Sequence, residues 1–193
     1  MPSSPWPERR AALGAGAALL AAPWLPARAD ETVRALLKSG GVVIAFRHAL
    51  APGTFDPPGF RVDDCSTQRN LNDEGRDQAR RIGQWFKAGG LVPARVRSSP
   101  WCRCVDTATL AFGAAERWDA LASPTGSDPA TRSQRIAELR RALAAVPAGR
   151  FEAWVTHQFV LQDLAATSTS SAEALVLRAG GSGIQLLARA SLY

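Results

Sequence analysis

Histidine and cysteine are scarce in this sequence, and it has no apolar run of membrane-spanning length. Its 193 residues include two histidines and three cysteines. The Ala/Gly/Leu run from Ala11 to Ala22 is too short and too rich in small residues to cross a bilayer as a stable helix. No run of Lys and Arg interleaved with aromatic residues occurs, which argues against a nucleic-acid-binding patch. We therefore expect no stable membrane anchor and no nucleic-acid partner.

The three cysteines are Cys65, Cys102 and Cys104. In an oxidising compartment two of them can pair, and the odd number leaves one free thiol. We expect a disulfide from Cys65 to either Cys102 or Cys104. The alternatives are buried thiols or a metal site at the Cys102-Arg103-Cys104 triplet. Zinc sites favour wider spacing and four ligands, so we expect no metal and no cofactor.

Residues 1–29 have the features of a cleavable export signal. Glu8-Arg9-Arg10 precedes the Ala/Gly/Leu run, and Ala27-Arg28-Ala29 has the small-x-small pattern that a signal peptidase recognises. We expect cleavage before Asp30, after either the twin-arginine or the general secretory route, and hence a periplasmic or secreted protein. The alternative is an ordinary amphipathic N-terminal helix. No cysteine stands at the cleavage point, so a lipid anchor is not indicated.

Residues 30–193 have the length of one domain. Removing 29 of the 193 residues leaves 164, enough to bury roughly 70% of the unfolded surface. The formal net charge is +6, and it falls to about +4 when residues 1–29, with three Arg and one Glu, are removed. This basic balance suits an anionic ligand.

Strand-like and helix-like segments alternate along this domain, which predicts an α/β fold with a mainly parallel sheet. The continuous apolar runs 41–46 and 151–156 predict buried central strands. A Pro- and Gly-rich loop follows the first run to about Asn70, and 113–131 is predicted to be irregular. Further strands are expected near 95–97, 174–177 and 184–188, and amphipathic helices at 72–88, around 105–112 and around 136–143.

Each of the two histidines follows the carboxyl end of one of these central strands. His48 follows the first strand and His157 the second, and ligands bind at this end of open α/β sheets. A neutral imidazole can attack phosphorus if a hydrogen bond to its other nitrogen fixes the tautomer. The attack places charge on phosphoryl oxygens, which Arg47, Arg103 and a protonated His157 would hold. The pattern predicts phosphoryl transfer through a covalent intermediate.

Four motifs in order resemble the histidine phosphatase (phosphoglycerate mutase-like) superfamily. Phe46-Arg47-His48-Ala49 resembles its Arg-His-Gly signature, and Asn70-Leu71-Asn72-Asp73-Glu74-Gly75-Arg76 resembles its Leu-Thr-x-Glu-Gly helix start. The segment from Ser98 to Ala108 is similar to its Ser-x-x-x-Arg-x-x-x-Thr-Ala motif, and Val155-Thr156-His157 stands where its second histidine belongs. The resemblance implies a three-layer α/β/α sandwich.

The resemblance also implies site roles. His48 would be phosphorylated, while Arg47, Arg103 and His157 would bind the phosphoryl group. Ala49 replaces a glycine, which could alter how the backbone approaches phosphate. Gln158 stands where the acid phosphatase branch has an acidic residue, so that branch does not indicate the proton donor.

Four loop carboxylates are candidates for a general acid: Asp56, Asp63, Asp64 and Asp119. We favour Asp56 because it is nearest to His48 in the sequence. A general acid contributes about 100- to 10,000-fold when the leaving group is a poor alkoxide. Without one, the substrate should have a good leaving group, as in an anhydride or a phosphoramidate.

We expect a phosphatase that hydrolyses a small phosphomonoester, such as an extracytoplasmic sugar or lipid ester. One alternative is a catalytically silent phosphate- or anion-binding protein, which would need the arginines but no nucleophile. The other is a phosphomutase. Export would separate a mutase from cytoplasmic sugar phosphates, and the short chain leaves little room for a capping insertion.

Overall fold

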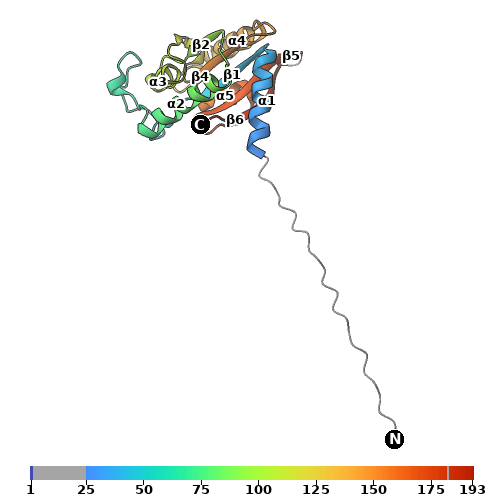
Figure 1. The fold of residues 1–193 in the computed structure, drawn as a ribbon. Helices are drawn as coiled ribbons and strands as arrows, with labels where there is room; N and C mark the ends of the chain where they lie inside the picture. Colours follow the sequence, from blue (N-terminus) through green and yellow to red (C-terminus); the bar gives the residue numbers. More distant parts are fainter. Residues whose placement is uncertain (2–24, 182) are drawn as a thin grey trace.

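The computed structural model describes Met1, residues 25–181 and residues 183–193 (Figure 1). Most of the expected signal segment, residues 2–24, lies outside the described residues. None of the described helices is long and apolar enough to cross a membrane.

The helices are α1 (Leu25–Ser39), α2 (Asp73–Ala88), α3 (Cys102–Phe112), α4 (Pro129–Ala144) and α5 (Gln158–Ala165), with short 3-10 turns η1 (Cys65–Thr67) and η2 (Asp119–Leu121). The strands are β1 (Val42–Arg47), β2 (Arg95–Ser98), β3 (Glu116–Arg117), β4 (Phe151–Thr156), β5 (Glu173–Gly180) and β6 (Gly183–Ser191).

The six strands form one sheet in the order β3-β2-β4-β1-β5-β6. The first four strands in this order run parallel, whereas β5 is antiparallel to both β1 and β6. The predicted α/β class is therefore confirmed, and its sheet is parallel around the two central strands. The final hairpin of β5 and β6 adds the antiparallel part.

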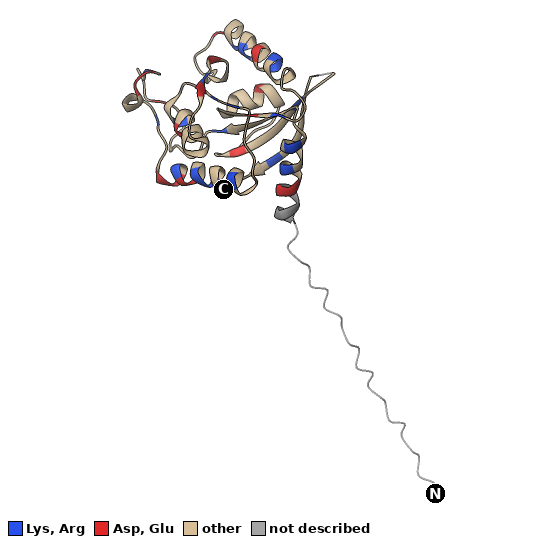
Figure 2. Ribbon diagram, turned by 45° about the horizontal axis from the view of Figure 1, so that its top comes forward, with Lys and Arg blue, Asp and Glu red and all other residues tan. Residues whose placement is uncertain are grey.

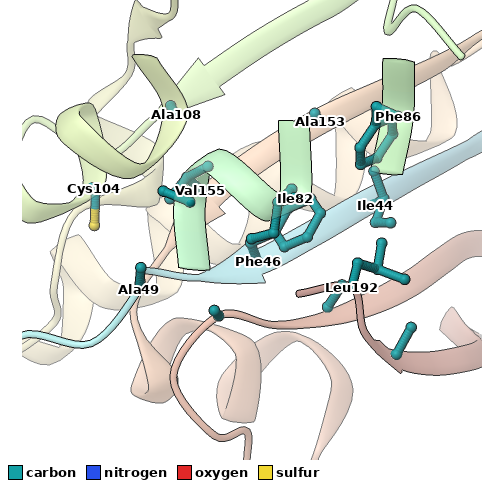
Figure 3. Close-up of a cluster of buried hydrophobic side chains, with 14 of the residues drawn as sticks. Ile44, Phe46, Ala49, Ile82, Phe86, Cys104, Ala108, Ala153, Val155 and Leu192 are labelled. Carbon is teal, nitrogen blue, oxygen red and sulfur yellow. The ribbon is translucent and has the colours of Figure 1, made fainter. Parts of the chain in front are cut away.

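Strand β1 is buried on both faces because its side chains alternate between two apolar clusters. Val42, Ile44 and Phe46 join one cluster, to which α1, α2 and α3 contribute. Val43 and Ala45 join the other, to which α4 and α5 contribute. Figure 3 shows the first cluster, where side chains of α2 lie against β1. This packing explains the continuous apolar run in β1.

Helix α2 begins where the sequence predicts. The Asn72 side chain accepts a hydrogen bond from the Gly75 N–H at 2.8 Å and caps the helix. Asp73 and Glu74 occupy the first turn, where negative charge is favourable. Figure 2 shows acidic residues at this end of the helix and basic residues farther along it.

Helix α1 begins at Leu25, before the expected cleavage point. Its later turns belong to the domain, since Val33 and Leu37 are buried in the core. The Asp30 carboxylate accepts a hydrogen bond from Trp85 Nε1 at 3.1 Å. Cleavage before Asp30 would thus retain every one of these contacts.

A disulfide joins Cys65 to Cys102 and leaves Cys104 as a buried free thiol. The expected disulfide and its single spare thiol are confirmed, with Cys102 as the partner. The bridge ties the long loop between β1 and α2, teal at the left of Figure 1, to the first residue of α3. Closing a sequence separation of 37 residues stabilises the fold by roughly 3 to 4 kcal/mol in a chain-entropy account.

Candidate active site

A cavity of about 240 Å³ lies beyond the carboxyl ends of β1 and β4. These strands are parallel neighbours, with Arg47 paired to Thr156, so the residues that follow them meet at one edge of the sheet. His48 and His157 both line the cavity, and their ring centroids are 5.5 Å apart. The structure brings together all the site residues predicted from the sequence, since the lining includes Arg47, His48, Asp56, Arg103 and His157.

His48 is buried, with one ring nitrogen held by the backbone. Its Nδ1 lies 2.8 Å from the Ala49 carbonyl oxygen, which can only accept, so Nδ1 carries the proton and Nε2 keeps its lone pair. Burial lowers the pKa of His48 to about 3; the hydrogen bond to Ala49 opposes this shift and the nearby arginines add to it. A neutral imidazole with a free Nε2 is the form that can attack phosphorus.

The His48 ring is expected to stay neutral, with the proton on Nδ1, from pH 8 to about pH 4. The pKa of His48 is lower in the folded protein than in the unfolded chain. Between pH 6.5 and about 3 the unfolded chain therefore binds a proton at His48 that the folded protein does not bind. Acidification through this window thus lowers the free energy of unfolding. Long-range ¹H–¹⁵N spectra of histidine-labelled protein measure both features, since the chain has two imidazole rings. Titration of the His48 ring near pH 6.5, or a proton on Nε2, would contradict the assignment.

His157 is buried and hydrogen-bonded at both ring nitrogens. Its Nε2 lies 2.8 Å from Ser99 Oγ, and its Nδ1 lies 3.4 Å from Arg103 Nη2. The guanidinium can only donate, so Nδ1 accepts and Nε2–H donates to Ser99. Burial, followed by the charge of Arg103, lowers the pKa of His157. The unliganded site therefore favours a neutral His157 over the protonated form expected from the sequence.

Three arginines line the cavity: Arg47, Arg69 and Arg103. Arg47 Nη1 donates to the Thr169 carbonyl at 2.7 Å, and Arg69 Nη1 donates to the Ala51 carbonyl. The Nε atom of each of the three arginines is buried without a hydrogen-bond partner. Burial and the charge of Arg103 lower the pKa of both Arg47 and Arg69. Such a group of like charges is favourable when an anion lies among them.

Asp56 holds three parts of the site together. Its Oδ1 accepts hydrogen bonds from Arg103 Nη1 at 2.8 Å and from the Arg69 backbone N–H at 3.0 Å. Its Oδ2 accepts from Trp101 Nε1 at 3.1 Å. Burial raises the pKa of Asp56, but these hydrogen bonds and the charge of Arg103 outweigh burial and lower it overall. An ionised, fully engaged carboxylate suits the positioning of Arg103 better than proton donation.

The three other candidate acids do not line the cavity. Asp64 caps η1 and pairs with Arg61, and Asp63 and Asp119 are exposed. Gln158 does line the cavity, but an amide cannot act as a general acid at neutral pH.

A sequence model of the histidine phosphatase superfamily (branch 1) matches residues 64–118. No curated protein matches the chain in sequence. Among solved structures, the protein histidine phosphatase SixA complexed with tungstate is 18% identical, with 78% of this chain and 96% of that one covered and a TM-score of 0.53. YhfR from Bacillus stearothermophilus is 15% identical, with 75% and 94% covered and a TM-score of 0.55. The alpha-ribazole phosphatase from Shigella flexneri is 12% identical, with the same coverage and a TM-score of 0.54. The three likenesses show a common fold.

Residues 64–118 thus resemble the histidine phosphatase superfamily in sequence, and the chain has the fold of these solved structures.

The segments that resemble the superfamily motifs meet at the loop that carries His48. The Ala49 backbone N–H donates to Thr107 Oγ1 of α3 at 3.0 Å, and the Leu50 N–H donates to Gln78 Oε1 of α2 at 3.0 Å. At Gly75 an added Cβ would lie 2.1 Å from the Leu50 carbonyl oxygen, so this helix start requires glycine. Ala49 is not among the non-glycine residues with positive φ. Alanine in place of the superfamily's glycine is therefore accommodated without backbone strain.

The region matched by the superfamily model includes Arg69 and Arg103 but neither histidine. The histidines are placed in the site by the parallel pairing of β1 with β4. Sequence reasoning missed Arg69 and Ser99. Arg69 directly precedes the helix-start motif, which begins at Asn70, and Ser99 lies within the next motif, which begins at Ser98.

Proposed function

We propose that this protein is a phosphatase that hydrolyses a phosphomonoester through a phosphohistidine formed on His48. The observation that carries the proposal is the hydrogen bond from His48 Nδ1 to the Ala49 carbonyl, which leaves Nε2 free in a cavity lined by three arginines. The names of two structural neighbours, SixA and the alpha-ribazole phosphatase, are those of phosphatases and support the same chemistry.

The charge of the cavity suits a phosphoryl dianion. Its charged lining residues are Arg47, Arg69 and Arg103 against Asp56, which gives a formal charge of +2 when both histidines are neutral. A phosphomonoester has a second pKa of about 6 and carries close to two negative charges at pH 7. The dianion would also favour protonation of His157, because a nearby opposite charge stabilises the charged form.

In the first step, His48 Nε2 attacks phosphorus and forms the N–P bond while the bond from phosphorus to the leaving oxygen breaks. The leaving oxygen takes the electron pair. The imidazole becomes positively charged, and the Ala49 carbonyl stabilises its Nδ1–H. In the second step, water attacks phosphorus, the N–P bond breaks, phosphate is formed and the proton of the water passes to solvent. The arginines stabilise charge on the phosphoryl oxygens in both steps.

The described cavity residues include no carboxyl group with a raised pKa, so no carboxyl group there is suited to protonate the leaving group. We infer that turnover falls steeply as the leaving group becomes more basic. Asp56 as a general acid stays a prediction, and it would make this dependence shallow.

A substrate series tests the proposed function. Purified protein should release inorganic phosphate from aryl phosphates, acetyl phosphate and phosphoramidate, and far more slowly from alkyl phosphates. Release of phosphate from alkyl and aryl esters at similar rates would support Asp56 as the general acid. Binding of phosphate without turnover of any compound would favour the silent anion-binding protein, and phosphoryl transfer within a sugar phosphate without release would favour a mutase.

We further propose that the protein is exported and that residues 1–29 are removed. The paired arginines, the small-x-small site and the Cys65–Cys102 disulfide all support an oxidising compartment. Protein recovered from a periplasmic fraction should begin at or near Asp30 on N-terminal sequencing. Recovery of intact chains from the cytoplasm alone would overturn the signal and the location together.

A further inference from the structure

Aromatic residues are concentrated around the cavity. Phe55, Phe60, Trp101 and Phe159 are four of its fifteen lining residues, whereas aromatic residues make up 7% of the chain. Trp101 is buried against the ring of His157, and Phe60 packs on Trp101 with ring centroids 6.0 Å apart. These two rings belong to the wall of the site. Phe55 and Phe159 need a separate explanation.

Phe55 and Phe159 have exposed rings at the cavity. Their residue exposures are 66% and 44%, and no other of the seven phenylalanines, all of which lie in the described part of the chain, is exposed. A single exposed apolar side chain is ordinary, but two exposed rings at one concave site indicate a surface that a ligand covers.

Phe55 and Phe159 are close in sequence to residues that would bind the phosphoryl group. Phe55 directly precedes Asp56, whose carboxylate is fixed by Arg103 and Trp101. Phe159 stands two residues after His157, in the first turn of α5. Both residues line the same cavity as His48 and the three arginines, so their rings adjoin the site of phosphoryl transfer.

The remainder of the lining carries no further charge. The charged lining residues are the three arginines and Asp56, which interact with one another, and the others include Thr54, Ser123, Thr125 and Gln158. A leaving group with its own carboxylate, ammonium or second phosphate would meet no dedicated partner here. An uncharged, flat group would be covered by the two rings.

We propose that Phe55 and Phe159 form a leaving-group subsite that selects phosphate compounds with an uncharged aromatic or heteroaromatic group. This inference rests on the proposed function, because it places the phosphoryl end of the same ligand among the arginines. It adds the substrate class, which the phosphoryl-binding groups alone do not define.

Phosphonates test the subsite separately from catalysis, because their C–P bond is not hydrolysed. In calorimetric titrations, wild-type protein should bind benzylphosphonate at least about 10-fold more tightly than methylphosphonate. Phe55→Leu and Phe159→Leu keep apolar bulk but remove the ring, and each should reduce this preference to about threefold or less while methylphosphonate affinity stays the same. Val92→Ala, which alters an exposed apolar residue outside this cavity, should behave as wild type.

Equal affinity for the two phosphonates, or an unchanged preference in both leucine variants with wild-type thermal unfolding, would overturn the subsite and leave the proposed function standing. Failure of both phosphonates to bind would overturn the anion site itself and, with it, this inference. A selective loss of benzylphosphonate affinity in either leucine variant supports the proposal.

Discussion

Replacing His48 by alanine is expected to lower phosphate release by at least about 10,000-fold, because His157, the other imidazole in the described lining of the cavity, is hydrogen-bonded at both ring nitrogens. His48 is 2% exposed, so its removal also leaves a small cavity. His48→Gln keeps most of the volume and should be equally inactive. Steady-state assays with an aryl phosphate, together with thermal unfolding of both variants, separate lost chemistry from lost folding.

His157→Ala is the matched control, since it removes the chain's other imidazole. His157 positions Arg103 and contacts Ser99, so its loss should lower the rate by about 100- to 1,000-fold without abolishing it. If His48→Ala turned over substrate as well as wild type, the nucleophile assignment would be wrong.

Replacing Arg103 by lysine is expected to lower kcat/KM by about 100- to 1,000-fold. Arg103 uses Nη1 for Asp56 and Nη2 for His157, and its Nε is left unpartnered in the buried site. Lysine has one nitrogen and cannot maintain both contacts while it also binds a phosphoryl oxygen. The substitution should therefore disturb Asp56 and His157 along with the bound phosphate.

Arg132→Lys is a suitable control for this experiment. Arg132 is half-exposed, pairs with Asp163 on the surface and does not line the cavity, so kcat/KM should not change. An Arg103→Lys enzyme as active as the Arg132→Lys enzyme would show that the two-pronged contact is unimportant.

The two central strands could be predicted because burial on both faces leaves a continuous apolar run. β4 coincides with the predicted range 151–156, and β1 differs by one residue at each end. The sequence also placed His48 and His157 at the carboxyl ends of these strands, and the parallel pairing of β1 with β4 in the structure brings them together. The start of α2 at Asn72 could be predicted from neighbouring residues, and one disulfide could be predicted from the number of cysteines.

Other elements gave weaker signals. The core-forming turns of α1 and the whole of α5 were not predicted. Helix α1 overlaps the expected signal segment, and α5 has only 8 residues. Strand β6 lies at the sheet edge and is mostly exposed or half-buried. It therefore lacks the apolar run that marks a central strand, and only part of it was predicted.

The partners within the site depend on contacts between distant residues. Ser99 and His157 are 58 positions apart, and Asp56 and Arg103 are 47 apart. Arg69 is one of 23 basic residues, and nothing in its spacing distinguishes it from solvated surface charges. The assignment of Asp56 to the positioning of Arg103 likewise rests on three hydrogen bonds that only the folded chain forms.

Localising a trapped phosphoryl group tests the nucleophile most directly. Wild-type protein would be mixed with an aryl [³²P]phosphate, quenched in alkali within milliseconds and digested with trypsin. Cleavage after Arg47 and Arg61 places His48 in peptide 48–61, and cleavage after Arg150 and Arg178 places His157 in peptide 151–178. We predict acid-labile label in peptide 48–61 alone. Label in peptide 151–178, or turnover with no labelled peptide 48–61 at any quench time, would contradict phosphoryl transfer to His48.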